Sequence, residues 1–413
     1  MARRTIAPQI ADISQDIAGE IPLPLILHWA TGSHTARRHQ DILAPHMVTG
    51  TTVSSDSAGL SKISQQKTLL EVMKLVHDPK VIVAAYGQAI GGQPIGVWAA
   101  DNTQMFYQDS IPTSAVIDQM LAAQHEIAAL PVRLGLGIHY GKFISLGGGL
   151  FGPDADLVEE LAETHTQGGD ITLTSQTHSR LPPGHQQLAA KTFVKDLNTH
   201  VFTLTPSATR PKTSRSGAKA QKTPSATYPF PFSQDFFDLL NRMGQTATKA
   251  DYDFCNRFSQ TKTILLLKIN HPHHPFLLDH FTHWILANSI VQKEIKDHHL
   301  ETIKSNGSLG IFLSDDPSQA LACALSLKDK LTTADYQASL GLSQGEVFVF
   351  PLPEGGKDIA GNPVNVASKL AEDVGTDSSI WIDSSVKLKK KPEKAKPFQV
   401  PVSGITLNGL KLA

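Results

Sequence analysis

The chain has 413 residues and a formal net charge of −1, and 18% of its residues are charged. This length favours two domains, and the balanced charge excludes a chain-wide basic field for nucleic acid. The two cysteines, Cys255 and Cys323, exclude a disulfide framework and a thiolate zinc cluster.

The sequence predicts neither a signal peptide nor a membrane-spanning segment. Its N-terminus has no apolar stretch of signal-peptide length. The apolar run IPLPLILHWA is interrupted by prolines and is too short to cross a bilayer. We therefore expect a cytoplasmic protein without a membrane or nucleic-acid partner.

The predicted elements begin in a segment, 1–45, that carries no motif and has one helix over 25–44. The next part, 46–205, alternates short strands and helices. Strands are predicted at 50–56, 95–101, 103–108, 132–141 and 170–175, and helices at 60–89, at 113–130 and after Gly152. This order predicts an α+β sheet with helices on one face, the ferredoxin-like βαββαβ arrangement.

A shift in composition at Pro206–Ala226 predicts a flexible linker. The stretch holds five basic residues and no acidic one, and it has almost no apolar side chain to bury. A nucleic-acid-binding arm is the alternative, but no aromatic residue interleaves with the basic ones. The linker and an aromatic-rich connecting segment together cover 206–261.

After the linker the pattern of 46–205 (copy one) is repeated in 262–413 (copy two). Three segments recur at nearly equal spacing, which indicates a duplicated domain. The repeated pairs are LGIHYGK at Leu136–Lys142 with LGLSQGE at Leu340–Glu346, FGPDADLVEELAE at Phe151–Glu163 with AGNPVNVASKLAE at Ala360–Glu372, and DITLTSQT at Asp170–Thr177 with SSIWIDSS at Ser378–Ser385.

One helix of copy two carries a polar pair that its stability does not require. The helix is predicted to begin with Asn362 as N-cap and Pro363 in its first turn. Asn365 and Lys369 then lie one turn apart on the same side. The pair is either part of a solvated helix face or one wall of a site.

The segment GNPVNVASKL with the preceding Asp358, and SSDSAGLSKIS at Ser54–Ser64, resemble motifs of the class III nucleotide cyclases, the adenylyl and guanylyl cyclases. The resemblance covers about 48–205 and 262–413. It implies two cyclase homology domains that form an intramolecular pseudo-heterodimer in a monomeric chain, with the active site between them.

By this resemblance copy one keeps the metal-binding half of the site. Asp56 and Asp101 match the two aspartates that hold two Mg²⁺ or Mn²⁺ ions. Ser57, Gly59 and Leu60 match residues whose backbone N–H groups bind the triphosphate.

The other half of the site is missing from copy one. Val97 and Gly149 stand at the positions of the base-recognising pair. Asp156 and Glu160 stand where the family has an asparagine and an arginine that act in the transition state. Acidic side chains at these positions would repel a triphosphate.

Copy two shows the converse pattern. Lys268 and Ser308 occupy its two metal positions and cannot hold the ions. The residues that match the family here are Lys304 and Asp358 for the base, Asn365 for the transition state, and Lys369 in place of the usual arginine. The resemblance thus implies one composite site.

The activity implied is that of an adenylate cyclase, which converts ATP to cyclic AMP and pyrophosphate for signal transduction. A lysine and an aspartate complement N1 and the N6 amino group of adenine, so Lys304 with Asp358 favours ATP. Two family contacts to the triphosphate are absent. Gly135 replaces an arginine, for which Arg133 is the candidate substitute, and Ser379 replaces a lysine.

Two alternatives stay open on the sequence. A catalytically impaired pseudo-cyclase would keep the fold and serve as a nucleotide-binding or protein-interaction module. Separately, NHPHHPFLLDHFTHW has five histidines, His271, His273, His274, His280 and His283, which suit either a transition metal or packing. No second histidine–carboxylate cluster is evident, so packing is favoured.

Overall fold

The computed structural model describes residues 23–58, 67–96, 98, 103–206, 229–270, 274–305, 308–353, 355–375, 378–402 and 405–412. The chain divides into two compact units. The copy-one unit comprises Leu43–Phe230 and Asp238–Ala247, and the copy-two unit comprises Met1–Ile42, Pro231–Phe237 and Thr248–Ala413. Among the described residues, no helix is both long and apolar enough to cross a membrane.

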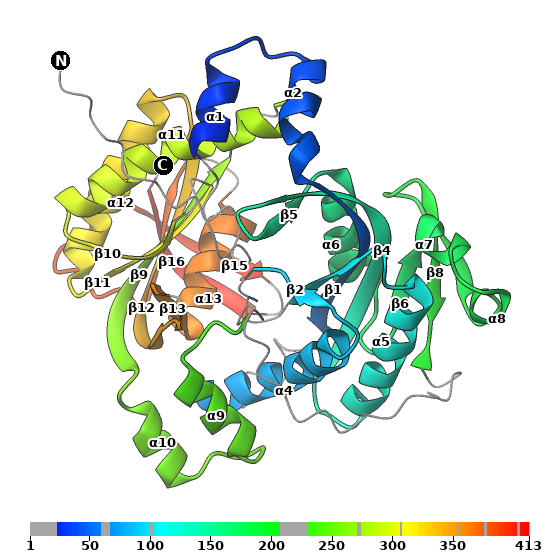
Figure 1. Cartoon of the computed structure of the whole chain (residues 1–413). Coiled ribbons are helices and arrows are strands. Elements are labelled where there is room, and N and C mark those ends of the chain that lie inside the picture. Colours follow the sequence, from blue (N-terminus) through cyan, green and yellow to red (C-terminus); the bar gives the residue numbers. More distant parts are fainter. Residues whose placement is uncertain are drawn as a thin grey trace. The chain divides into compact units, whose positions relative to one another are not determined.

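The copy-one unit is built on one mixed sheet (Figure 1). Its strands lie in the order β2 (Gln93–Pro94), β3 (Thr103–Gln108), β1 (Met47–Ala58), β4 (Arg133–Leu146), β6 (Ile171–Thr174), β8 (Thr199–Leu204) and β7 (Ala190–Val194), and β5 (Gly149–Phe151) pairs with β4. The first four are antiparallel. With α4 (Leu69–Gln88) and α5 (Thr113–Ile127) as crossovers, they confirm the βαββαβ prediction.

The copy-two unit repeats this sheet strand for strand. Its order is β10 (Glu301–Ser305), β11 (Leu309–Ser314), β9 (Ser259–Asn270), β12 (Gln337–Pro351), β14 (Ile380–Asp383), β16 (Ile405–Leu412) and β15 (Lys396–Val402), with β13 (Lys357–Ala360) on β12. Its crossover helices are α11 (Leu277–Asp297) and α12 (Pro317–Thr333). The shared order confirms two copies of one α+β domain.

Helices cover both faces of the copy-two sheet, so the prediction of helices on one face is wrong. Leu265 and Leu267 of β9 pack with residues of α11 and α12. Ile264 and Leu266 point to the other face, where they pack with Ala367 of α13 (Asn362–Ser368). The sequence signal was the unbroken apolar run ILLL, which is typical of a strand buried on both faces.

Three local predictions differ from the structure. Gly361, not Asn362, is the N-cap of α13, and Asn362 is its first helical residue. The predicted strand 95–101 is wrong at Ile95, Gly96 and Trp98, because β2 ends at Pro94. The single N-terminal helix is two helices, α1 (Leu23–Ala30) and α2 (Ala36–Leu43), with a turn between them that contains Gly32.

The remaining helical elements of the described residues are η1 (Ala44–His46), α6 (Pro153–His165), α7 (Ser175–Ser179), α8 (Pro183–Gln186), α9 (Gln234–Arg242), α10 (Lys249–Cys255) and the π-helical η3 (Lys369–Val374) that continues α13. The predicted linker residues 207–226 lie outside the described part of the chain.

The duplication extends to the helix pair before each copy, which sequence reasoning missed. Helices α1 and α2 flank Gly32, and α9 and α10 flank Gly244, 212 residues later. The N-terminal pair packs on α11, where the buried Trp29 donates a hydrogen bond of 2.7 Å to Asp279. Apart from the glycine, little in the two helix pairs is alike, so sequence alone gave no sign of the repeat.

Candidate functional site

Strand register shows which residues of the two copies are equivalent. Asp56 of β1 lies opposite Gly135 of β4, and Lys268 of β9 lies opposite Ser339 of β12. One residue earlier, Ser55 faces Leu136 as Leu267 faces Leu340, the residues that begin the repeated LG motifs. Asp56 and Lys268 therefore occupy the same position, as the sequence comparison predicts.

The neighbouring strands show which residue of copy two corresponds to Asp101. Ser55 pairs with Thr103 of β3, and Leu267 pairs with Gly310 of β11. Ser308, two residues before Gly310, is thus the counterpart of Asp101, two residues before Thr103. Asp101 itself lies outside the described residues, as do Gly59, Leu60 and Val97.

The described residues that the resemblance assigns to metal and triphosphate binding lie at the end of β1 and the start of β4. Asp56 and Ser57 are half-buried there, and the exposed Arg133 begins the adjacent strand opposite Ala58. Gly135 leaves little room for a side chain, because a Cβ atom there would lie 3.0 Å from the carbonyl oxygen of Thr166. Arg133 is therefore the cation that β4 presents at this end of the sheet.

The residues at this strand end suit a hard cation in chemistry. Carboxylate oxygens are the ligands that Mg²⁺ prefers, and the partly exposed carboxylate of Asp56 is of that kind. Asp56 alone cannot complete a site. In the described ranges, no group of three or more His, Cys, Asp and Glu side chains could hold a metal ion.

The two residues of copy two that the resemblance assigns to base recognition meet in the structure. Lys304 of β10 and Asp358 of β13 form an ion pair of 2.9 Å, and their side chains are only 14% and 6% exposed. The second carboxylate oxygen of Asp358 accepts a hydrogen bond of 2.7 Å from the backbone N–H of Ile359. Both oxygens are therefore held in fixed directions inside one unit.

Copy one has no charged pair at the corresponding positions. Gly149 faces Leu146 in the hairpin of copy one, at the register point where Asp358 faces Phe350 in copy two. Lys304 lies opposite Ile311, and the corresponding residue of copy one is Ile95, which donates a hydrogen bond to Gln104. The strand register thus favours Ile95 over Val97 as the counterpart of Lys304.

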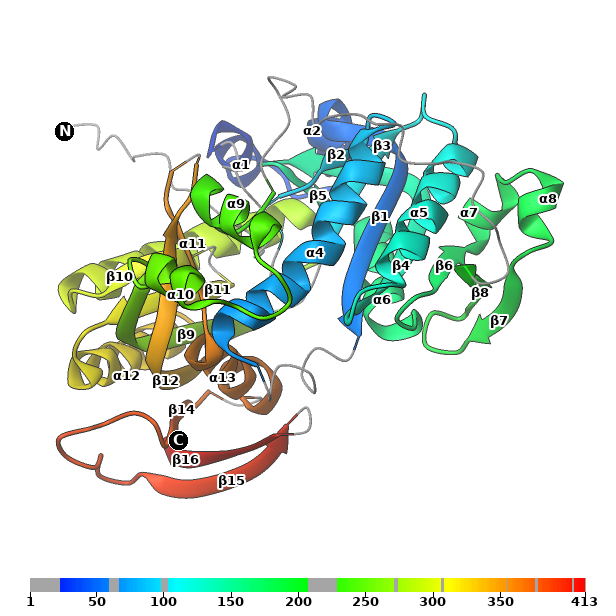
Figure 2. The ribbon, with the colours of Figure 1, turned by 90° about the horizontal axis from the view of Figure 1, so that it is seen from below.

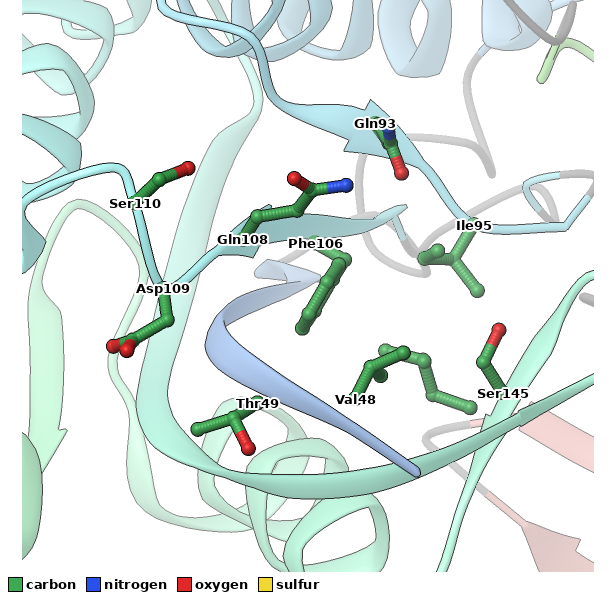
Figure 3. A pocket seen from close by; sticks show the side chains of 10 residues that line it. Val48, Thr49, Gln93, Ile95, Phe106, Gln108, Asp109, Ser110 and Ser145 are labelled. Atoms are coloured by element: carbon green, nitrogen blue, oxygen red, sulfur yellow. The ribbon is translucent and has the colours of Figure 1, made fainter. Parts of the chain in front are cut away.

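A hollow of about 400 Å³ lies beside Ile95 in the copy-one unit (Figure 3). Its lining includes the apolar side chains of Phe106 and Leu150 and the amides of Gln93 and Gln108. The carboxylate of Asp109 points away from it and accepts a hydrogen bond of 2.7 Å from Tyr140. Copy two has the Lys304–Asp358 ion pair where copy one has this hollow.

Asn365 and Lys369 lie on the partly exposed side of the helix that follows β13. The N–H of Lys369 donates to the carbonyl oxygen of Asn365, which places the two residues one turn apart. Lys369 Nζ lies 3.7 Å from Asp373, and its side chain is 25% exposed. In copy one the corresponding residues, Asp156 and Glu160, are both exposed on α6. The two helices therefore differ in surface charge at these positions.

The described histidines of the His-rich segment pack on one another. The rings of His274 and His283 stack with centroids 4.2 Å apart, and His280 Nε2 lies 3.0 Å from the carbonyl oxygen of His274. His283 Nδ1 lies 3.1 Å from the hydroxyl of Tyr336. Face-to-face rings do not converge on a shared ion, so we assign these residues a packing role. His271 and His273 lie outside the described residues.

Comparison with solved structures decides the fold. A class III adenylyl cyclase-like ATP-binding protein from Pseudomonas aeruginosa superposes with a TM-score of 0.50 at 12% identity, over 82% of this chain and 84% of that one. The chain has the class III nucleotide cyclase fold. The resemblance seen in the motifs is thus confirmed, and the superposition extends over most of both chains.

Single cyclase domains match smaller parts of the chain. The adenylyl cyclase CyaB from P. aeruginosa has a TM-score of 0.32 at 15% identity over 38% of this chain and 92% of its own. The guanylyl cyclase Cya2 has a TM-score of 0.32 at 18% identity over 38% and 90%. No family model matches the sequence. No curated protein matches it either.

Proposed function

We propose that the chain is an adenylate cyclase in which the two copies contribute complementary halves of one ATP site. The observation that carries the proposal is the exchange of charge at equivalent positions. Copy one has Asp56 where copy two has Lys268, and copy two has the Lys304–Asp358 pair where copy one has Ile95 and Gly149. Each copy lacks the proposed site residues that the other copy keeps. Independent, random loss of residues would not give this complementary pattern.

The proposed reaction forms the bond between O3′ of the ribose and the α-phosphorus, and it breaks the bond to pyrophosphate. Two divalent ions held by Asp56 and Asp101 would supply Lewis acidity at the phosphate oxygens and lower the pKa of the attacking hydroxyl. Asn365 would orient the ribose, and Lys369 would offset negative charge that develops on the α-phosphate. Ser57, Gly59, Leu60 and Arg133 would bind the triphosphate.

Base choice rests on Lys304 and Asp358. Aspartate accepts from the N6 amino group of adenine and lysine donates to N1, whereas guanine presents the opposite pattern on that edge. The two side chains already face each other at 2.9 Å. A bound adenine would insert between these partners and keep both charges hydrogen-bonded. Keeping them satisfied matters because an unpaired buried charge is costly.

A nucleotide-binding protein without turnover is the second candidate. Lys369 supplies a charge but lacks the bidentate geometry of arginine. It also lies near Asp373, which competes for it at 3.7 Å. The similar structure from P. aeruginosa is described as a class III adenylyl cyclase-like ATP-binding protein. These observations favour slow or absent turnover with nucleotide binding retained.

The test is cyclic nucleotide formation by the full chain with ATP or GTP and either Mg²⁺ or Mn²⁺. We expect cyclic AMP from ATP and a loss of at least about a hundredfold in Asp56→Asn. Asp109→Asn, which removes an exposed carboxylate of the same copy, is the matched control and should keep full activity. If the wild-type chain binds ATP but makes no cyclic AMP, the protein is instead a nucleotide-binding protein without turnover.

A further inference from the structure

The helix that carries Asn365 and Lys369 has a second, apolar side that packs on the C-terminal hairpin of copy two. Val366, Leu370 and Val374 succeed one another on this side, a turn apart. They pack with side chains of β14, β15 and β16, namely Trp381, Phe398, Val400, Val402, Ile405 and Leu407. Figure 2 shows β15 and β16 as a long hairpin below α13.

Two aromatic side chains, Trp381 and Phe398, form the centre of this contact, and we call them the aromatic wedge. Their ring centroids are 4.9 Å apart at an interplanar angle of 77°. Trp381 is 6% exposed, and the ammonium of Lys411 lies 4.5 Å from the centre of its ring. An edge-to-face pair beneath a cation is a rigid support, since aromatic rings have few rotamers and fit one another in specific orientations.

Copy one lacks the wedge at the same register positions. Trp381 pairs with Lys411 of β16 as Thr172 pairs with Thr203 of β8. Counting outward to the edge strand, Phe398 corresponds to Thr192 of β7. The copy that lacks the asparagine and the lysine on its helix therefore has threonines in place of both aromatic rings.

The helix itself also differs between the copies. In copy one α6 is a continuous α-helix from Pro153 to His165. In copy two the equivalent span changes to a π-helix at Lys369, and β15 contacts that π-helical segment. A π-helix is rare and is less favourable than an α-helix, so it persists only where packing holds it, frequently at functional sites.

We propose that Trp381 and Phe398 are positioning residues that hold α13 and η3 in the rotation needed by Asn365 and Lys369. This inference rests on the proposed function. Asn365 and Lys369 each precede a wedge-facing residue, Val366 and Leu370, by one position. Rotation about the helix axis would therefore move the polar pair and the apolar side together. A displacement of 1 Å at reacting groups costs about a hundredfold in rate.

The variants that test this are Trp381→Thr and Phe398→Thr, which install the residues of copy one. Trp381→Phe and Phe398→Leu are milder changes that keep most of the apolar volume. Phe281→Thr in α11 is the matched control, because it empties a buried aromatic site of the same unit away from the helix. The measurements are kcat and KM for ATP and amide hydrogen exchange in 362–374.

We expect kcat to fall about tenfold in the threonine variants with KM changed less than threefold. Amide hydrogen exchange should be faster in 362–374 but unchanged in α11. The milder variant Trp381→Phe should keep most of the wild-type kcat. A kcat per folded molecule that matches the Phe281→Thr control, or exchange that rises equally everywhere, would overturn the inference. If the wild type does not turn over, the proposed function fails, and exchange in 362–374 alone decides for or against the wedge.

Discussion

The Lys304–Asp358 ion pair is the residue-scale feature on which the proposed choice of ATP rests. Both side chains are nearly buried, and the carboxylate has one oxygen on Lys304 and the other on a backbone N–H. Removing one partner of such a pair leaves an uncompensated buried charge, whereas removing both often costs little. The pair thus lets stability and nucleotide recognition be separated by mutation.

Lys304→Met should lower the free energy of unfolding by about 3 kcal/mol, because Asp358 is left buried and unpaired. The double variant Lys304→Met/Asp358→Leu should recover most of that loss. Both variants should lose the preference for ATP over GTP. Urea unfolding and nucleotide titration measure the two effects. Selective ATP binding by the stable double variant would contradict the assignment of the base site.

Lys357→Met is the control for this pair. Lys357 is next to Asp358 in sequence, but it is half-exposed and pairs with Glu301 at the surface. Exposed pairs contribute about 0–1 kcal/mol. The control should therefore leave stability and the preference for ATP nearly unchanged.

His77 of α4 gives a prediction for pH. Burial lowers the pKa of His77 from 6.5 to about 4, although Asn241 offers a hydrogen bond at 3.1 Å. The folded state therefore prefers the neutral ring, while the unfolded chain binds a proton below pH 6.5. The contribution of His77 to the free energy of unfolding is therefore fully present above pH 6.5. It is lost as the pH falls toward 4, by about 3 kcal/mol in total.

His77→Gln should flatten this acid dependence, since glutamine can keep a hydrogen bond to Asn241 without taking up a proton. Urea unfolding at pH 7, 6, 5 and 4 measures it. His200→Gln, at an exposed position, is the matched control and should keep the wild-type slope. An identical slope in wild type and His77→Gln would show that other groups govern acid unfolding.

The resemblance to the cyclase motifs pointed to Lys304, Asp358, Asn365 and Lys369, which lie in short, continuous segments. It assigned Val97 as the counterpart of Lys304, whereas strand register gives Ile95. The reason is the length of the hairpin connection, because eight residues separate Ile95 from Gln104 and only six separate Lys304 from its partner Ile311. Counting back from the aligned aspartate position without a gap therefore reaches Val97 instead of Ile95.

At the scale of elements, both copies pack one helix very close to the sheet, α13 in copy two and α6 in copy one. A Cβ atom on Gly341 would lie 2.1 Å from the carbonyl oxygen of Ala367 in α13. In copy one a Cβ atom on Gly137 would lie 2.8 Å from the backbone nitrogen of Ala162 in α6. Each glycine lets a helix backbone pack directly on a strand.

Gly341→Ala should therefore push α13 from β12 and lower the free energy of unfolding by about 1–3 kcal/mol. It should also reduce cyclic AMP formation more than ATP binding, because it displaces the helix that carries Asn365. Gly244→Ala, where an added Cβ atom would meet nothing within 4 Å, is the control and should be neutral. Equal unfolding curves for the two variants would contradict the close approach.

The sequence predicted the order of strands and helices well, since period-two and period-3.6 patterns are local. It did not predict that helices cover both faces of the copy-two sheet, that a helix pair precedes each copy, or that α13 continues as a π-helix from Lys369. These depend on what packs against an element rather than on its own pattern. Trp381 and Phe398 lie in a strand and a hairpin that looked like ordinary sheet in the sequence, so the support of the helix became visible only in the structure.

At the scale of the whole molecule, duplication followed by complementary loss is the central claim. Two copies with identical strand order would each be expected to keep a full set of residues if each served its own site. Instead the position of Asp56 is a lysine in copy two, and the position of Asp358 is a glycine in copy one. The proposed function therefore predicts one bound nucleotide per chain.

Calorimetric titration of the full chain with ATP and Mg²⁺ tests this claim most directly, because it counts sites whether or not turnover follows. The account predicts one ATP per chain. It also predicts weakened binding in Lys304→Met/Asp358→Leu and in Asp56→Asn, variants of different copies. Two bound ATP molecules per chain, or a single one whose affinity responds to the variants of only one copy, would contradict it.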